Sequence, residues 1–144
     1  MSASIRRGSS FAPLPNTARG SETVLIVDDE DVVRGLVDSI LELQGYRVLT
    51  VASAGEALTR AATYDGDIDL LLTDVDLPDM SGRELAQRLR GERPEIRLLY
   101  MSGHNDEEIA GYGVLASGDL FLPKPFTVSA LTARVREVLD NQSW

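Results

Sequence analysis

The chain has 144 residues, 43% of them hydrophobic, which suits one domain with a real core and excludes a multidomain enzyme. Its 23 acidic and 14 basic side chains give a formal charge of −9, which disfavours nucleic-acid binding because phosphate backbones repel an acidic surface. The absence of cysteine excludes disulfides, thiol catalysis and thiolate zinc sites. No stretch approaches the ~18 apolar residues of a membrane-spanning helix and no signal peptide is recognisable, so we expect a cytoplasmic domain.

The first twenty residues differ in composition from the rest. They contain Arg6, Arg7 and Arg19 and no acidic residue, and Ser, Gly, Pro and Asn make up a large part of them. Such a segment has little apolar surface to bury. We therefore predict a flexible arm or linker over residues 1–20 and the folded domain over residues 21–144.

Short apolar runs along residues 21–144 predict strands, separated by segments with helical spacing of apolar residues. Continuous apolar runs are typical of strands that are buried on both faces in parallel sheets. The predicted strands, in chain order, are Thr23–Val27, Tyr46–Val51, Ile68–Thr73, Ile96–Met101 and Leu120–Leu122.

The helices predicted after these strands have recognisable starts and stops. Apolar residues from Val32 to Leu41 recur at helical spacing, and Gly45 follows them as a stop. Two capping boxes begin the next helices. The remaining expectations are a helix from Ser53 to about Ala62, one from Ser81 to about Arg90, a short one over Asp106–Gly111, and a final one capped by Thr127.

Five repeats of strand and helix predict an α/β fold with a parallel sheet between two helical layers. The crossovers of such a fold are right-handed. Ligands bind at the edge where the strands have their carboxyl ends. The residues that follow the strands are therefore the first candidates for a functional site.

Charged and hydroxyl side chains follow four of the five predicted strands, and the clustering of acids needs a neutralising partner. A hard divalent cation such as Mg²⁺ takes oxygen ligands of this kind. A carboxylate beside the cation can attack phosphorus, and a lysine, a hydroxyl and a backbone N–H can neutralise the equatorial oxygens. These residues are Asp28 and Asp29 after the first strand, Asp74 and Asp76 after the third, Ser102 after the fourth, and Lys124, the only lysine of the chain, after the fifth.

Four motifs together resemble the receiver domain of two-component signalling, from about Thr23 to Leu139. That resemblance implies a flavodoxin-like fold with strand order 2-1-3-4-5. The motifs are Val-Leu-Ile-Val-Asp28-Asp29-Glu30, Leu-Leu-Thr-Asp74-Val-Asp-Leu-Pro78-Asp-Met80-Ser-Gly82, Leu-Leu-Tyr-Met-Ser102-Gly103 and Phe121-Leu-Pro-Lys124-Pro125-Phe126.

The resemblance also implies a role for each site residue. Asp74 would be the phosphoacceptor. The side chains of Asp29 and Asp74 and the carbonyl of Asp76 would hold Mg²⁺, with Asp28 acting through water. Ser102 and Lys124 would contact the phosphoryl group, and Phe121 would be the aromatic switch residue that responds to Ser102.

The same resemblance implies that the domain receives its phosphoryl group from another protein and does not act on a small-molecule substrate. The donor would be a sensor histidine kinase or a histidine phosphotransfer protein. The domain would catalyse its own phosphorylation and dephosphorylation without being a stand-alone enzyme. A homodimer that forms on phosphorylation is one open way of passing on the signal. The one histidine, His104, lies in a loop, where a solvated residue is a better interpretation than a phosphorylated one.

Two segments are similar to receivers fused behind hybrid sensor kinases. They are Leu99–His104 and Phe121–Phe126. A third segment, Gly8–Pro15, weakly resembles the last strand of a kinase ATP-binding domain. Both a stand-alone regulator and the C-terminal receiver of a hybrid histidine kinase therefore stay open.

Other functions fit the residues less well. Asp74-Val75-Asp76 matches the local pattern of haloacid dehalogenase-type phosphatases, but in that family the nucleophile follows the first strand. A binding module without phosphorylation is expected to have lost some of the acids or the lysine. A Rossmann nucleotide site needs a Gly-rich loop after the first strand, and this chain has none there.

Overall fold

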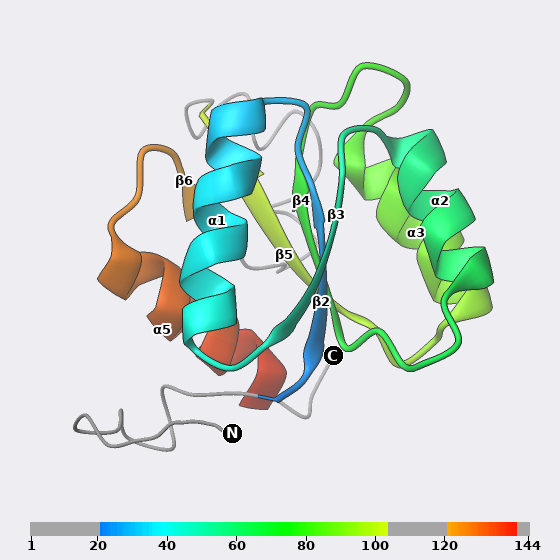
Figure 1. Ribbon diagram of the computed structural model, residues 1–144. Helices are drawn as coiled ribbons and strands as arrows, with labels where there is room; N and C mark the ends of the chain where they lie inside the picture. Colours follow the sequence, from blue (N-terminus) through cyan, green and yellow to red (C-terminus); the bar gives the residue numbers. More distant parts are fainter. Residues whose placement is uncertain (1–20, 104–120, 141–144) are drawn as a thin grey trace.

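A five-stranded parallel sheet lies between two layers of helices in the computed structural model, which describes residues 21–103 and 121–140 (Figure 1). The strands run in the order β3-β2-β4-β5-β6, which is the order 2-1-3-4-5 implied by the family resemblance. Every neighbouring pair is parallel. The strands are β2 (Thr23–Val27), β3 (Arg47–Val51), β4 (Leu70–Asp74), β5 (Arg97–Ser102) and β6 (Phe121–Pro123).

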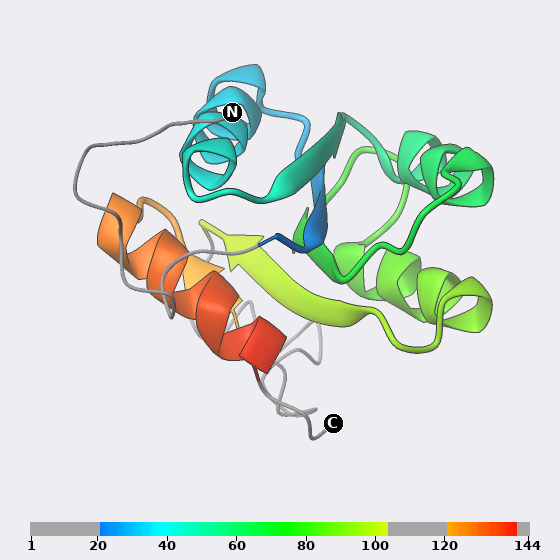
Figure 2. The ribbon, with the colours of Figure 1, turned by 60° about the horizontal axis from the view of Figure 1, so that its bottom comes forward.

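The described helices divide between the two faces of the sheet. Helices α1 (Asp31–Leu43) and α5 (Val128–Asp140) cover one face, and α2 (Ala54–Thr63) and α3 (Gly82–Glu92) cover the other (Figures 1 and 2). None of these helices is long and apolar enough to cross a bilayer.

Side-chain caps begin three of these helices, as their sequences predict. The Ser53 hydroxyl accepts a hydrogen bond from the Glu56 N–H at 3.2 Å. The Ser81 hydroxyl does the same for Glu84 at 3.1 Å. Thr127 caps α5 through the N–H of Ala130 at 3.0 Å. Each bond satisfies an N–H that the first turn of a helix leaves without a backbone partner.

The core has two halves because successive strand residues point to opposite faces of the sheet. Leu71 of β4 packs in the half under α2 and α3, whereas Leu70 and Leu72 pack in the half under α1 and α5. Burial on both faces explains the nearly unbroken apolar runs of the strands. These runs fix the sheet and leave the polar residues at its carboxyl edge.

Strand β2 has the predicted boundaries, and the other four strands differ from the predicted ones by one or two residues at one or both ends. Asp74 and Ser102 are the last residues of their strands rather than the first residues of the loops, because the backbone ladder continues to Asp74↔Met101 and Ser102↔Pro123. Tyr46 is not in β3, because its N–H caps α1 at the Leu41 carbonyl (3.1 Å) after Gly45 turns the chain with a φ of 98°.

Four expectations lie outside the described residues. They are the arm over 1–20, the short helix over 106–111, the loop position of His104 and the place of Leu120 in the fifth strand.

Helix α2 is fastened at both ends by residues that flank α3. The Asp79 carboxylate accepts hydrogen bonds from the N–H groups of Ala54 (3.0 Å) and Gly55 (2.8 Å) at the start of α2. These bonds lower the pKa of Asp79, with the Gly55 bond as the main cause. Beyond the end of α3, the Arg93 guanidinium donates to the carbonyl of Ala61 at 2.8 Å. Helices α2 and α3 are therefore linked by polar contacts as well as by packing.

Helix α5 is fastened to the start of β2 by Arg136. Its guanidinium forms a two-pronged ion pair with Glu22, with a shorter distance of 2.6 Å, and also binds Asp140 at 2.9 Å. This contact with Arg136 lowers the pKa of Glu22. The same guanidinium lies 5.9 Å from the ring centre of Tyr46, within cation–π range.

Candidate functional site

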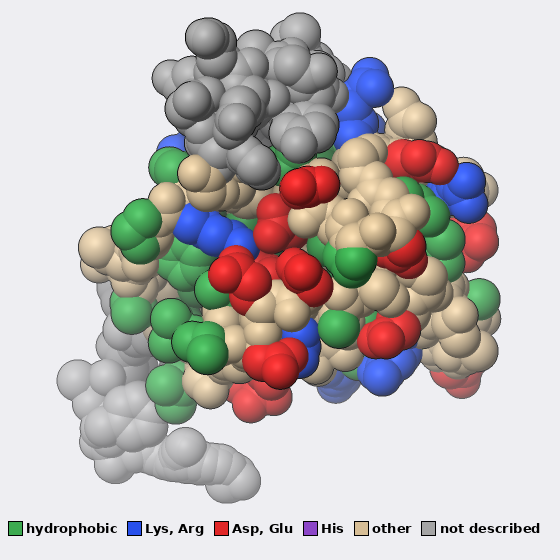
Figure 3. All heavy atoms as spheres, turned by 90° about the horizontal axis from the view of Figure 1, so that it is seen from above, with side chains coloured by type: hydrophobic (Ala, Val, Ile, Leu, Met, Phe, Trp, Pro, Cys, Tyr) green, Lys and Arg blue, Asp and Glu red, His purple; other side chains and the backbone are tan. Residues whose placement is uncertain are grey.

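The register of the sheet brings the predicted site residues to one level at the carboxyl edge. Val27 pairs with Thr73, so the next residues lie at the same level, with Asp28 directly after β2 and Asp74 at the end of the neighbouring β4. Ser102 ends β5, and Lys124 directly follows β6. The view onto this edge shows acidic side chains gathered around it (Figure 3).

Asp74 is buried at the end of the central strand β4, with 8% of its surface exposed. One carboxylate oxygen accepts a hydrogen bond from the N–H of Asp76 (3.2 Å) and the other accepts one from Lys124 (3.0 Å). Burial raises the pKa of Asp74 above its usual value, the two hydrogen bonds oppose this, and the nearby Asp28 carboxylate adds to it. Burial therefore disfavours the charged form of Asp74, and the Asp76 N–H and Lys124 favour it.

Lys124 is the cation that joins the carboxylates. Its ammonium donates to Asp28 Oδ2 at 2.9 Å, to Glu30 Oε1 at 2.8 Å and to Asp74 Oδ2 at 3.0 Å. Burial disfavours the charge on Lys124, but the hydrogen bonds to Glu30, Asp28 and Asp74 outweigh burial and raise its pKa. The ammonium therefore stays protonated and partly neutralises three acids.

Asp28 is the most buried acid of the site, with no exposed surface. Besides the bond from Lys124, its carboxylate accepts the N–H of Glu30 at 2.9 Å. Its own carbonyl accepts the Arg34 guanidinium at 2.7 Å. Asp28 is thus fixed by both side-chain and backbone contacts between β2 and α1.

Glu30 is a further residue of the site, to which the sequence pattern assigns no role although the first motif contains it. Its carboxylate, with those of Asp28 and Asp74, completes a group whose ligand oxygens all lie within 4.8 Å of one another. Glu30 reaches the site because it is the N-cap residue of α1, so the helix begins with this side chain over the carboxyl edge. The third acid in the run Asp28-Asp29-Glu30 was the available signal.

The other predicted residues occupy different surroundings. Asp29 and the side chain of Asp76 are exposed, and neither belongs to the carboxylate group of Asp28, Glu30 and Asp74. Ser102 is fully buried, and its carbonyl accepts the N–H of Lys124 at 2.8 Å. Phe121 pairs with Tyr100 in the ladder and packs, partly buried, against the core half under α2 and α3.

The donor set of the site suits a hard divalent cation. The carboxylate oxygens of Asp28 and Asp74, which lie with that of Glu30 within 4.8 Å of one another, are donors of the kind that Mg²⁺ prefers, and the three acids together concentrate negative charge. The same three side chains all lie within hydrogen-bonding distance of the Lys124 ammonium, so they already surround one positive charge. The residues present therefore fit a metal ion beside the lysine.

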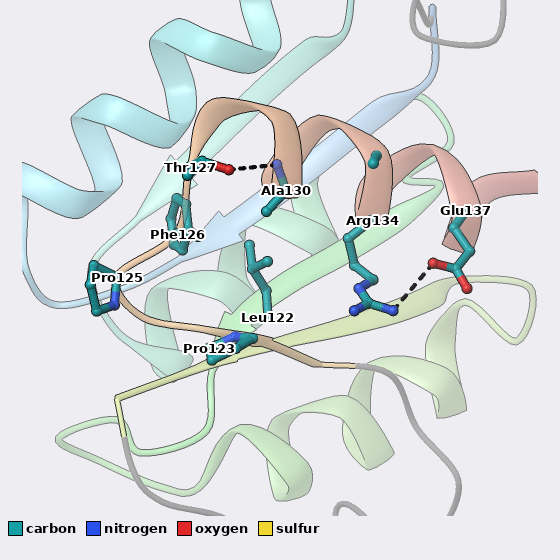
Figure 4. A pocket seen from close by; sticks show the side chains of 9 residues that line it. Leu122, Pro123, Pro125, Phe126, Thr127, Ala130, Arg134 and Glu137 are labelled. Atoms are coloured by element: carbon teal, nitrogen blue, oxygen red, sulfur yellow. Dashed lines mark hydrogen bonds and ion pairs between the residues drawn. The ribbon is translucent and has the colours of Figure 1, made fainter.

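A groove lies between β6 and α5, next to the segment that carries Lys124. Its cavity volume is about 480 Å³, and Leu122, Pro125 and Phe126 form its apolar end (Figure 4). The Arg134–Glu137 ion pair forms the polar end. The groove contains none of the acids of the site, but Pro123 and Pro125 on its wall flank Lys124.

Comparisons with known proteins agree with this arrangement. Residues 24–136 match the family described as the response regulator receiver domain. The chain is 37% identical to the sensor kinase CckA of Brucella abortus over 85% of its own length and 13% of that protein. It is 34% identical to the probable transcriptional regulatory protein TcrX of Mycobacterium tuberculosis, over 81% of this chain and 49% of that one. The chain thus spans half or less of these curated relatives.

Solved structures show the same fold. The receiver domain of the hybrid histidine kinase CckA superposes with a TM-score of 0.69 at 35% identity, covering 82% of this chain and 99% of that one. A CheY-like receiver from Methanospirillum hungatei JF-1 gives 0.73 at 31% identity, covering 84% and 95%. The fold, the acidic pocket with its lysine and the family match over 24–136 lead to one conclusion: this chain belongs to the response regulator receiver domains of two-component signalling, and is not itself a catalytic enzyme domain.

Proposed function

We propose that Asp74 accepts a phosphoryl group from a phosphohistidine and that the domain passes this signal on through a changed surface. The observation that carries the proposal is the placement of Asp74, a buried carboxylate at the end of the central strand with Lys124 at 3.0 Å. In the transfer, the P–N bond of the donor breaks with its electron pair returning to the imidazole, and a P–O bond forms to a carboxylate oxygen of Asp74. Lys124 and the N–H of Asp76 are positioned to neutralise charge.

We propose that Mg²⁺ is the cofactor of this site. When bound, it would supply charge neutralisation for the phosphoryl oxygens. The proposed ligands are the side chains of Asp29 and Asp74 and the carbonyl of Asp76, with Asp28 acting through water. Support comes from the convergence of the Asp28 and Asp74 carboxylates on the carboxyl edge. The buried Ser102 is the proposed hydroxyl contact, and Phe121 the proposed switch residue.

The proposed donor is a sensor histidine kinase or a histidine phosphotransfer protein. An exposed apolar face of α1 begins beside the site with Val32, which is 83% exposed, and continues with Leu36. Exposed apolar residues at helical spacing next to a reactive carboxylate suit the packing of a donor protein that must bring its phosphohistidine to Asp74. Such contacts would select the protein donor and would not be needed by a small phosphodonor.

The signal is proposed to leave the site through β5, β6 and the groove beside them. Lys124 is bonded through its backbone to Ser102, and Pro125, the next residue, lines the groove. A movement of the lysine toward a phosphoryl group would therefore change the shape of the groove surface. A homodimer that forms on that surface after phosphorylation is a further part of the proposal.

The chain is proposed to work in the cytoplasm, with residues 1–20 as an arm before the domain of 21–144. Whether it acts alone or as the receiver of a hybrid kinase depends on what precedes the arm. The similarity to receivers of CckA proteins favours the second arrangement.

The central test uses acetyl phosphate with Mg²⁺ and intact-mass spectrometry. We expect one added phosphoryl group, absent without the metal and absent in Asp74→Asn. Asp76→Asn is the matched control, because this neighbouring acid is exposed and serves the site through its backbone. A phosphoryl group that persists in Asp74→Asn contradicts the assignment.

A further inference from the structure

The ammonium of Lys124 has three N–H bonds, and all three are used by carboxylates. Their partners are Asp28, Glu30 and Asp74, at 2.8 to 3.0 Å. An ammonium has no further donor to offer. A phosphoryl oxygen on Asp74 can therefore be bound by Lys124 only if one of the present partners gives up its bond.

Glu30 is the partner that is most easily released. Its side chain is 59% exposed, whereas those of Asp28 and Asp74 are 0% and 11% exposed. A carboxylate that is already largely in water stays solvated when it loses the ammonium, but the buried Oδ2 atoms of Asp28 and Asp74 would lose the partner that Lys124 provides. The Glu30 side chain also makes no capping bond to α1, so its release would not disturb the helix.

We propose that Glu30 is a positioning residue, an exchangeable counterion that holds Lys124 over Asp74 until phosphoryl oxygens replace it. The inference rests on the proposed function and adds a regulatory element to the same site. Glu30 competes with the incoming group for the third N–H of the lysine, and its negative charge repels an anionic donor. Glu30 should therefore slow phosphorylation and weaken the binding of phosphoryl mimics.

The test compares Glu30→Gln and Glu30→Ala with Asp31→Asn and Asp31→Ala. Asp31 is the adjacent acid, is also exposed, and pairs with Arg34 instead of Lys124. The control therefore removes the same charge from nearly the same place. For an exposed ion pair we expect the rate of phosphorylation by acetyl phosphate to rise about two- to fivefold in Glu30→Ala, with Glu30→Gln between it and wild type. The Asp31 variants should stay close to wild type.

A second readout follows the lysine itself. Because Lys124 is the only lysine, protein labelled with ¹³C,¹⁵N-lysine gives one lysine side-chain signal. Titration with beryllofluoride and Mg²⁺ should move that signal and should show two- to fivefold tighter binding in Glu30→Ala than in wild type. The affinity for Mg²⁺ alone should change no more in the Glu30 variants than in the Asp31 variants.

The outcomes separate the two hypotheses. If wild-type protein accepts neither a phosphoryl group nor beryllofluoride, the proposed function fails and this inference fails with it. If wild type is phosphorylated but the Glu30 variants match the Asp31 variants, only the role of Glu30 is wrong. Slower phosphorylation together with weaker Mg²⁺ binding in Glu30→Gln would also overturn it, because Glu30 would then be a metal ligand.

Discussion

Gly82, the first residue of α3, packs directly on the backbone of Asp74. A methyl group built on its Cα would lie 2.2 Å from the Asp74 carbonyl oxygen. The Gly82 N–H also donates to the Val75 carbonyl at 2.7 Å. The start of α3 and the end of β4 are therefore in backbone contact, and only glycine allows this approach.

Gly82→Ala should destabilise the domain and disturb the site together. The methyl group must displace backbone rather than a flexible side chain, and overpacking of this kind costs roughly 1–3 kcal/mol. We expect a lower midpoint in urea denaturation and slower phosphorylation of Asp74. Gly35→Ala is the control, because a methyl group there meets nothing within 4 Å in the middle of α1. It should gain up to about 1 kcal/mol from helix propensity, and equal effects at both positions would disprove the contact.

Asp74→Asn should stabilise the metal-free domain at neutral pH. Burial raises the native pKa of Asp74 above the usual 3.8, so the unfolded chain gives up this proton more readily than the folded one. Ionisation of Asp74 therefore lowers stability as the pH rises through its native pKa, and the loss persists above it. In EDTA the variant should melt higher than wild type at pH 7, and its advantage should shrink toward pH 4. If the difference in melting temperature between the variant and wild type did not change with pH, ionisation of Asp74 would be excluded as its cause.

Mg²⁺ should reduce the stability advantage of Asp74→Asn over the wild type. If its dissociation constant is about 1 mM, roughly 10 mM Mg²⁺ adds about 1.4 kcal/mol to the wild type. For a domain of this size the melting temperature would rise by roughly 3–8 °C. Asp74→Asn should gain less, and sodium at matched ionic strength should not reproduce the shift. A full gain in the variant would show that the metal binds elsewhere.

Lys124→Arg should separate phosphorylation from signalling. The ammonium fits among three carboxylates at 2.8 to 3.0 Å, where the planar fork of arginine is too wide. We expect phosphorylation to occur, while the amide NMR signals of β6 and the start of α5 no longer shift as they do in wild type. Arg134→Lys, a cation exchange at the far end of the groove, should leave those shifts intact. Wild-type shifts in Lys124→Arg would remove the lysine from the signalling path.

The exposed face of α1 should matter for a protein donor and not for acetyl phosphate. Val32 and Leu43 are almost equally exposed, at 83% and 82%, but only Val32 lies beside the site. Val32→Ser should slow transfer from a phosphohistidine protein by up to about tenfold, the effect of roughly 1.4 kcal/mol of apolar contact. Leu43→Ser should have little effect, and both variants should react normally with acetyl phosphate. Equal transfer rates would rule out donor docking at this end of α1.

The sheet and its edge were predictable because they depend on local patterns. Apolar runs with both faces buried identify parallel strands, and alternation with helices fixes the layers. Strand ends then place Asp28, Asp74, Ser102 and Lys124 on one edge without any knowledge of distances. The caps at Ser53 and Ser81 were equally visible, because a capping box is complete within four residues.

The contacts that the sequence did not predict join residues that the fold brings together from separate parts of the chain. The run of acids after β2 includes Glu30, but it does not show that this N-cap residue of α1 contacts Lys124, 94 positions along the chain. The hydrogen bonds from α2 to the Asp79 carboxylate, and the close packing of Gly82 on Asp74, likewise depend on how loops and helices pack against the sheet. The observed strand ends differ from the predicted ones for a related reason. Pairing with a neighbouring strand extends the backbone ladder, as at Asp74↔Met101 and Ser102↔Pro123, and the local pattern does not show this.

Arg136 holds Glu22 and Asp140 with one guanidinium, so the chain enters and leaves the described domain at adjoining points. Glu22 precedes β2 at the amino edge of the sheet, opposite the edge that carries Asp74. A fold whose two ends adjoin can be appended to, or inserted into, a longer polypeptide without rearrangement of its interior. Whatever is joined at either end is attached on the side away from the acidic pocket. The geometry suits a portable module, a unit of the kind that occupies 13% of one relative and 49% of another.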